Sequence, residues 1–141
     1  MRSLFTHSLP ISSAHTLAQP HLSAEEIKEF YSACGKPHGH LYQIEITHDF
    51  SGFAAGEATP IFLRRRRQIE DFFKTNINGK NLNELFENTA GEALSPAFFK
   101  ILKQHDFGEH VIEVALQETA KNRFLTFSQN TFAEQPNHGQ H

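Results

Sequence analysis

Alternating apolar and polar residues mark four segments of the chain as β-strands. Residues 4–17 alternate from the start, and Pro10 within them indicates a bulge or a sheet edge, because proline has no N–H for the ladder. A second strand is expected from about His38 to His48, where β-branched and aromatic residues gather. The remaining two strands are expected at residues 110–118 and 123–131.

Other segments carry the helical period. Residues 22–33 place apolar side chains three and four positions apart, and Ser23 with Glu26 has the spacing of a capping box. Residues 62–77 are predicted to form a second helix with one apolar stripe. The dipeptide Asn78-Gly79 then predicts a tight turn.

The start of a third helix has two candidate positions. Thr89 and Glu92 have capping-box spacing, whereas Ser95 followed by Pro96 is typical of an N-cap with proline at the first helical position. In either case the helix is expected to end near His105. Helices grouped between two pairs of strands predict an α+β fold with an antiparallel sheet.

Length and composition narrow the class of protein. The 141 residues fit one domain, expected at residues 1–133 with a mobile tail at 134–141. A net charge of −3 does not indicate nucleic-acid binding. No apolar run is long enough to span a membrane, and the single cysteine, Cys34, fits a reducing cytoplasm.

The densest concentration of metal-ligand chemistry is Cys34-Gly35-Lys36-Pro37-His38-Gly39-His40. Because strand side chains alternate, His38 and His40 would share one face with Cα atoms about 6.6 Å apart. Imidazoles suit zinc, and a catalytic zinc site needs three protein ligands and an open position. His15 on the first strand is the candidate third ligand. The alternatives are a turn with two surface histidines and a structural histidine at position 15.

Four consecutive cations, Arg64 to Arg67, lie within the predicted helix 62–77. Four residues in a row wrap around a helix, so at most two share a face. They are interpreted first as a solvated helix surface, with binding of a substrate phosphate as the alternative.

Four landmarks spread over residues 4–128 have the order and spacing of motifs in a known family. Ile11-Ser12-Ser13-Ala14-His15-Thr16-Leu17 resembles Phe-x-Ala-Ala-His-x-Leu, and Cys34-x-x-x-His38-Gly39-His40 matches Cys-x-x-x-His-Gly-His. Leu82-Asn83 with Glu87-Asn88 and Glu92 resembles Leu-Asn and Asn-Pro-Thr-x-Glu, and Gln117-Glu118-Thr119 resembles a Glu-Thr pair. The chain thus resembles the 6-pyruvoyl-tetrahydropterin synthase family, most closely its 6-carboxy-tetrahydropterin synthase branch.

The resemblance implies a tunnelling fold, in which a four-stranded antiparallel sheet carries two helices on one face. Three subunits would close a β-barrel, and two trimers would stack into a hexamer. It also implies a cytoplasmic, zinc-dependent carbon–carbon lyase acting on the pterin 7,8-dihydroneopterin triphosphate in queuosine biosynthesis. By carry-over, His15, His38 and His40 bind Zn²⁺, Cys34 is the catalytic thiol, and Glu118 binds the pterin ring.

One departure from the family pattern concerns proton transfer. The family carries Leu-Asp-His-x-x-Leu-Asn, whereas this chain has Asn78 and Gly79 in place of the Asp-His pair. Neither can act as an acid or a base. Lys80 and the transposed pair His105-Asp106 are the candidate substitutes.

Two classes of function follow from this departure. The first is a lyase of the 6-carboxy-tetrahydropterin synthase type with altered activity. The second is a diverged zinc- and pterin-binding paralogue without this turnover. A lyase of the 6-pyruvoyl-tetrahydropterin synthase type is a further alternative.

Overall fold

The computed structural model describes residues 2–15, 23, 25–26, 38–118 and 122–128. Its four strands form one antiparallel sheet in the order β1-β2-β3-β4, which confirms the predicted α+β class. Pro10 lies on β1, an outer strand of this sheet, where a missing N–H costs no ladder hydrogen bond. The strands are β1 (Leu4–His15), β2 (His38–Asp49), β3 (Val111–Gln117) and β4 (Arg123–Phe127).

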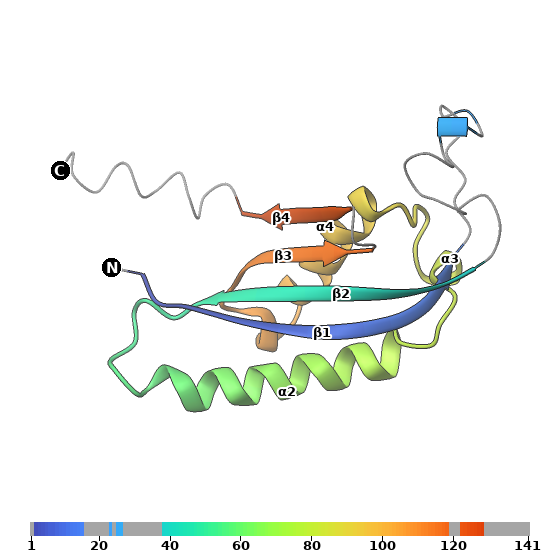
Figure 1. Cartoon of the computed structure of the whole chain (residues 1–141). Helices are drawn as coiled ribbons and strands as arrows, with labels where there is room; N and C mark the ends of the chain where they lie inside the picture. The colour runs from blue at the N-terminus through green and yellow to red at the C-terminus, as the bar shows by residue number, and fades with distance from the viewer. Residues whose placement is uncertain (1, 16–22, 24, 27–37, 119–121, 129–141) are drawn as a thin grey trace.

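The first two strands are longer than the last two. β1 and β2 have 12 residues each, whereas β3 has 7 and β4 has 5. The pairing of β2 with β3 begins at Gln43, so the β1–β2 ladder extends beyond the rest of the sheet (Figure 1). This extension carries His15 of β1 and both His38 and His40 of β2.

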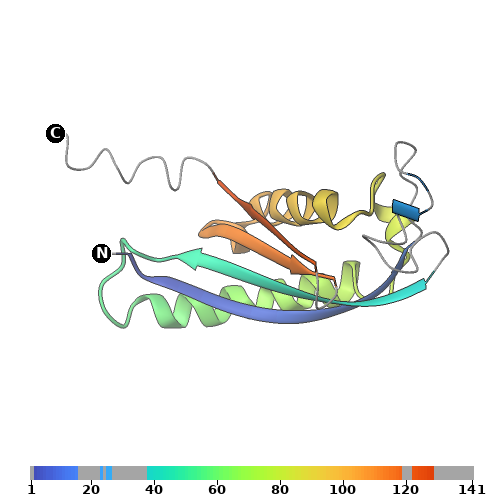
Figure 2. The same cartoon turned by 45° about the horizontal axis from the view of Figure 1, so that its top comes forward.

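Two long helices, α2 (Ala58–Asn76) and α4 (Gly91–Lys103), lie on the same side of the sheet (Figure 2). The short helices α3 (Leu82–Leu85) and η1 (Asp106–Gly108) flank α4 in the chain. The predicted apolar stripe of α2 is confirmed, because its residues Phe62, Ile69 and Phe73 are buried. The core between helices and sheet is built from large apolar side chains, among them Ile11, Tyr42, Ile44, Ile46, Phe73, Leu94, Phe98, Leu102, Val114 and Leu116.

The start of α2 differs from the prediction. The helix begins at Ala58, four residues before the expected start at residue 62. Pro60 is its third residue, and the first N–H groups of a helix have no partner within the helix. Proline is therefore tolerated there.

The start of α4 also differs from both candidate positions. The helix begins at Gly91 after Ala90, so Pro96 lies inside it, and it ends at Lys103. A Cβ atom at Gly91 would lie 2.1 Å from the ring of Phe124 on β4. Any larger residue at position 91 would have to displace this ring, which is a tertiary constraint that capping patterns do not report.

Some predictions concern residues outside the described part. The predicted helix at 22–33 falls mostly there, but its capping box is confirmed: Ser23 and Glu26 exchange hydrogen bonds of 3.1 and 3.0 Å. The tail at 134–141 also lies outside the described residues. Within the described part, no helix combines the length and the apolar character that crossing a membrane requires.

Candidate functional site

Three histidine positions meet at the extended end of the β1–β2 ladder. His15 is directly opposite His38, and Ser13 is opposite His40. Directly opposed residues have Cβ atoms about 4.5–5.5 Å apart, and diagonal neighbours are about 7–8 Å apart. By strand alternation, all three histidine positions have the parity of the buried pair Ile11 and Tyr42. The backbone register is therefore compatible with a shared metal ion.

The side chains of the three histidines lie outside the described part of the structure, and so does all of Cys34. Among the described side chains, no group of three or more His, Cys, Asp or Glu could hold a metal ion. The roles of His15, His38 and His40 as zinc ligands, and of Cys34 as the catalytic thiol, therefore stay predictions. The donor set itself fits zinc, because three imidazoles leave one coordination position open.

Glu118 lies at the same end of the sheet. It follows β3 directly, and Gln117 before it pairs with Gln43, three residues or about 10 Å along β2 from His40. The Glu118 side chain is only 4% exposed. Burial raises its pKa to about 7, because the charged form loses hydration. At neutral pH this carboxyl group is consequently present in both protonation states.

The Asn78-Gly79 dipeptide forms the predicted turn, and the turn is bonded to β1. The Lys80 amide donates to the Ile77 carbonyl, and Gly79 has a φ of +76° that favours glycine. Asn78 Oδ1 accepts a hydrogen bond from the Ser12 amide at 2.6 Å. Both residues at the positions of the family's Asp-His pair are thus engaged in backbone structure. The exposed Lys80 lies at the same end of the sheet as His15.

The other candidate substitute, His105-Asp106, lies at the opposite end of the sheet. This pair precedes β3, whereas Glu118 follows it, so the length of β3 separates them by about 20 Å. The His105 ring packs against Phe107 and Phe72, with centroid distances of 4.7 and 5.0 Å. Within one chain, His105 and Asp106 therefore cannot replace the missing acid–base pair.

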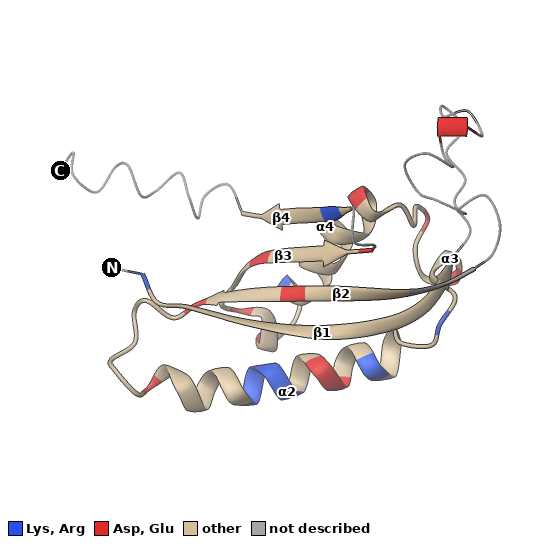
Figure 3. Ribbon diagram, in the orientation of Figure 1, with Lys and Arg blue, Asp and Glu red and all other residues tan. Residues whose placement is uncertain are grey.

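The arginine run lies on α2, away from the histidine positions (Figure 3). Arg65 is 3.6 Å from Glu109, and Arg66 is 3.6 Å from Glu70. From Arg67 to the end of α2 at Asn76 the helix rises about 14 Å. The interpretation as a helix surface with exposed ion pairs is favoured over binding of a phosphate at the proposed site in the same chain.

A buried histidine pair, His7 on β1 and His48 on β2, was not singled out from the sequence. The two Nε2 atoms are 3.3 Å apart, and the rings are 7% and 0% exposed. Burial, with a smaller contribution from nearby cationic groups, lowers the pKa to about 4 for His7 and to about 3 for His48. The alternation of β1 places His7 on the inward face, but only the register shows that His48 meets it.

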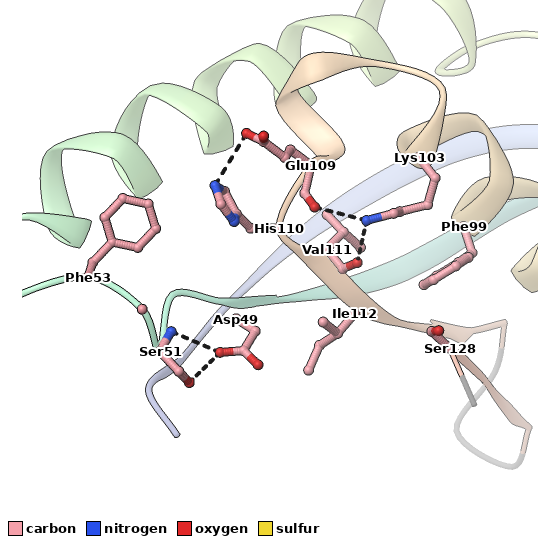
Figure 4. Close-up of a pocket in the computed structure, with 11 residues that line it drawn as sticks. Asp49, Ser51, Phe53, Phe99, Lys103, Glu109, His110, Val111, Ile112 and Ser128 are labelled. Atoms are coloured by element: carbon pink, nitrogen blue, oxygen red, sulfur yellow. Dashed lines mark hydrogen bonds and ion pairs between the residues drawn. The ribbon is translucent and has the colours of Figure 1, made fainter. Parts of the chain in front are cut away.

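A cavity of about 490 Å³ lies near the Asp49 end of β2 (Figure 4). Polar groups in its wall already bind one another. Lys103 Nζ donates to the carbonyls of Gly108, Glu109 and Val111, while Asp49 accepts hydrogen bonds from Ser51. This cavity is far from Glu118 and from the histidine positions, so we do not assign the pterin to it.

The sequence matches no protein-family model and no curated protein. The fold, in contrast, matches solved structures. It resembles 6-pyruvoyl tetrahydropterin synthase from Caenorhabditis elegans, with a TM-score of 0.68 and 21% sequence identity. The match covers 92% of this chain and 97% of that protein's chain. It also resembles an uncharacterized protein from Wolinella succinogenes, with a TM-score of 0.61, 12% identity, and coverage of 92% and 99%. The chain therefore has the fold of 6-pyruvoyl tetrahydropterin synthase.

Proposed function

We propose that the protein is a zinc-dependent lyase of the 6-carboxy-tetrahydropterin synthase type. Its substrate would be 7,8-dihydroneopterin triphosphate. The products would be 6-carboxy-tetrahydropterin, which leads to queuosine, together with acetaldehyde and triphosphate. One observation carries the proposal. In a fold shared with a pterin synthase, the opposed positions His15 and His38, the nearby His40 and the buried carboxyl group of Glu118 occupy one end of the sheet.

The three histidines would hold one zinc ion through their neutral nitrogen atoms. Bound zinc would act as a Lewis acid toward the oxygen atoms of the substrate side chain. Cys34 comes four residues before His38 in the sequence. A thiol beside a cation has a lowered pKa, so Cys34 can accept a proton from carbon at neutral pH.

Glu118 would recognise the pterin ring. A carboxylate can accept paired hydrogen bonds from the pterin amine and an adjacent ring N–H. Because burial raises the pKa of Glu118 to about 7, this carboxyl group is partly protonated at neutral pH before pterin binds. Pterin donors favour the charged form, so binding should lower this pKa. Pterin affinity should consequently increase as the pH rises through 7.

A second candidate function is a zinc- and pterin-binding paralogue without this turnover. The turn favours it, because the Asn78 side chain and the Gly79 amide are both bonded to Ser12. An amide and a glycine cannot replace an Asp-His pair in proton transfer. A product of the 6-pyruvoyl type is a further possibility, and product analysis separates it from the first candidate.

Self-association into a trimer or a dimer of trimers is part of the proposal. β4 is the last strand of the described sheet and carries the exposed side chains Leu125 and Phe127. Exposed apolar side chains on an outer strand are suited to contact with another subunit. On β1, in contrast, the turn at Asn78 to Lys80 already covers Ser12 and Ala14.

The test is to incubate the zinc-loaded protein with 7,8-dihydroneopterin triphosphate and to measure acetaldehyde and the pterin product. Acetaldehyde from the unsubstituted protein, and none from His38→Ala, would support the lyase. Pterin binding without acetaldehyde would support the paralogue instead. Absence of both zinc and pterin binding would refute the proposal.

A further inference from the structure

We infer that Asn78 is a positioning residue for the proposed zinc site, because its side chain fixes the end of β1 that carries His15. This inference rests on the proposed function. It gives a role to a residue at a position where the resembled family has an acid–base side chain. Four hydrogen bonds join the turn after α2 to three consecutive residues of β1.

Asn78 and Gly79 together hold both backbone groups of Ser12. Asn78 Oδ1 accepts from the Ser12 amide at 2.6 Å, and the Gly79 amide donates to the Ser12 carbonyl at 2.5 Å. The Asn78 amide itself donates to the Phe73 carbonyl at 2.8 Å, which fixes the turn to the end of α2. Ser12 is three residues before His15. The side chain of Asn78 thus links α2 to β1 just before the proposed ligand.

Two further tethers follow Ser12 along β1. Ser13 Oγ donates to the Ile77 carbonyl at 3.1 Å, and the Ala14 amide donates to the Lys80 carbonyl at 3.2 Å. Ala14 also forms a parallel bridge with Asn81. The turn therefore lies along the outer edge of β1, and its described contacts reach Ala14, the residue before His15.

These tethers matter because nothing else in the described sheet supports this end of β1 except β2. The β1–β2 ladder continues past the first β2–β3 pair at Gln43, and two strands alone are marginally stable in water. Zinc requires ligand distances within about 0.2 Å of ideal values. Holding Ser12 to Ala14 in place fixes both His15 and, through the register, the opposing residues 38–40.

The experiment compares Asn78→Leu, which removes the acceptor oxygen, with Asn78→Asp, which retains one. Asn76→Leu is the matched control, because exposed Asn76 bonds only Phe72 of its own helix among the described contacts. Zinc affinity is measured by competition with a chelating indicator, and exchange of the Ser12 amide is followed by NMR. Ser13→Ala removes a second tether and provides an independent variant.

We expect Asn78→Leu to weaken zinc binding by about tenfold, in the range found for residues that orient metal ligands. Exchange of the Ser12 amide should accelerate by about tenfold, as expected for loss of one hydrogen bond. Asn78→Asp and Asn76→Leu should retain both properties, and Ser13→Ala should weaken zinc binding in the same direction.

Equal zinc affinity in the unsubstituted protein, Asn78→Leu and Ser13→Ala would overturn the positioning role and leave the proposed zinc site intact. Failure of the unsubstituted protein to bind zinc would overturn both the proposed site and this inference. Amide exchange at Ser12 then shows whether the tether itself exists, since that measurement does not require metal.

Discussion

The buried histidine pair should make the fold sensitive to mild acid. His7 and His48 have pKa values of about 4 and 3 in the folded protein, against an ordinary value of 6.5. The unfolded chain therefore binds more protons than the folded chain below pH 6.5, and stability falls as the pH falls. The ring nitrogens Nδ1 are buried and have no hydrogen-bond partner among the described residues, so protonation has no local acceptor to stabilise it.

The magnitude follows from the two pKa values. At pH 5, which is 1.5 units below the ordinary pKa, each ring that stays neutral in the folded protein lowers the free energy of unfolding by about 2 kcal/mol, at 1.36 kcal/mol per unit. The sum for two rings is about 4 kcal/mol, which residual solvent screening reduces to about 3 kcal/mol. The surroundings do not offset this cost, because the charged groups that act on the pair are cationic: Arg65, Arg66 and Lys103, with His110 also nearby.

Glu118 acts in the opposite direction and must be removed from the measurement. Its pKa is raised from 4.5 to about 7, so ionised Glu118 destabilises the fold fully above pH 7, and this cost declines as the pH falls from 7 toward 4.5. The assay is urea unfolding of metal-free Glu118→Gln protein at pH 7 and pH 5, followed by circular dichroism. The comparison is the same protein with His7→Leu and His48→Leu, which removes both titrating rings.

We expect the free energy of unfolding of Glu118→Gln to fall by about 3 kcal/mol between pH 7 and pH 5. The variant without the pair should lose much less. His105→Leu, which removes a histidine outside the pair, should behave like the Glu118→Gln parent. Equal loss of stability with and without the pair would refute the reasoning.

Three further predictions concern the proposed site and the assembly. Cys34→Ala should keep one zinc per subunit by elemental analysis, but its steady-state turnover should fall by at least about 10²-fold because a general base is removed. Loss of zinc would show instead that Cys34 is a ligand. Asn78→Asp combined with Gly79→His should lower the free energy of unfolding, measured in urea, by about 1–2 kcal/mol, because position 79 has a φ of +76°. Asn78→Asp alone should leave the free energy of unfolding nearly unchanged. Equal stability of the two variants would contradict this account of the turn. Light scattering at micromolar concentration should report a trimer or hexamer, which Leu125→Glu should weaken; a monomer would contradict the assembly.

The four strands were predictable because each signal is local. Period-two alternation identified β1 to β4, and Pro10 correctly indicated an outer strand. The turn at Asn78-Gly79 was also predicted correctly from its dipeptide. These features depend on a few neighbouring residues, so an isolated sequence contains enough information to find them.

The features that the sequence did not reveal depend on contacts between distant segments. The close packing of Phe124 against Gly91, 33 positions earlier and the first residue of α4, is one such contact. Likewise, a turn can be predicted at Asn78, but its bond to Ser12 joins residues 66 positions apart. Such contacts are decided by packing and register, which local propensity does not contain.

The candidate site shows the same division. The spacing of His38 and His40 on one strand was a local inference, and His15 was a candidate on another strand. The register now places position 15 directly opposite position 38. The distant alternative, His105-Asp106, was excluded within one chain only by the arrangement of α4 and β3. The sequence alone could not decide whether His105-Asp106 or Lys80 lies nearer to the proposed site.

X-ray absorption at the zinc edge of the purified protein reports the atoms bound to the metal, and it therefore tests the proposed set of three histidine ligands. The account predicts one zinc ion with three imidazole nitrogen atoms at about 2.0–2.1 Å and one further light ligand at the open position. The variant His38→Ala should lose the bound zinc, and with it the zinc-edge signal that shows imidazole scattering. A sulfur neighbour at about 2.3 Å, or a zinc environment that His38→Ala leaves unchanged, would contradict the account.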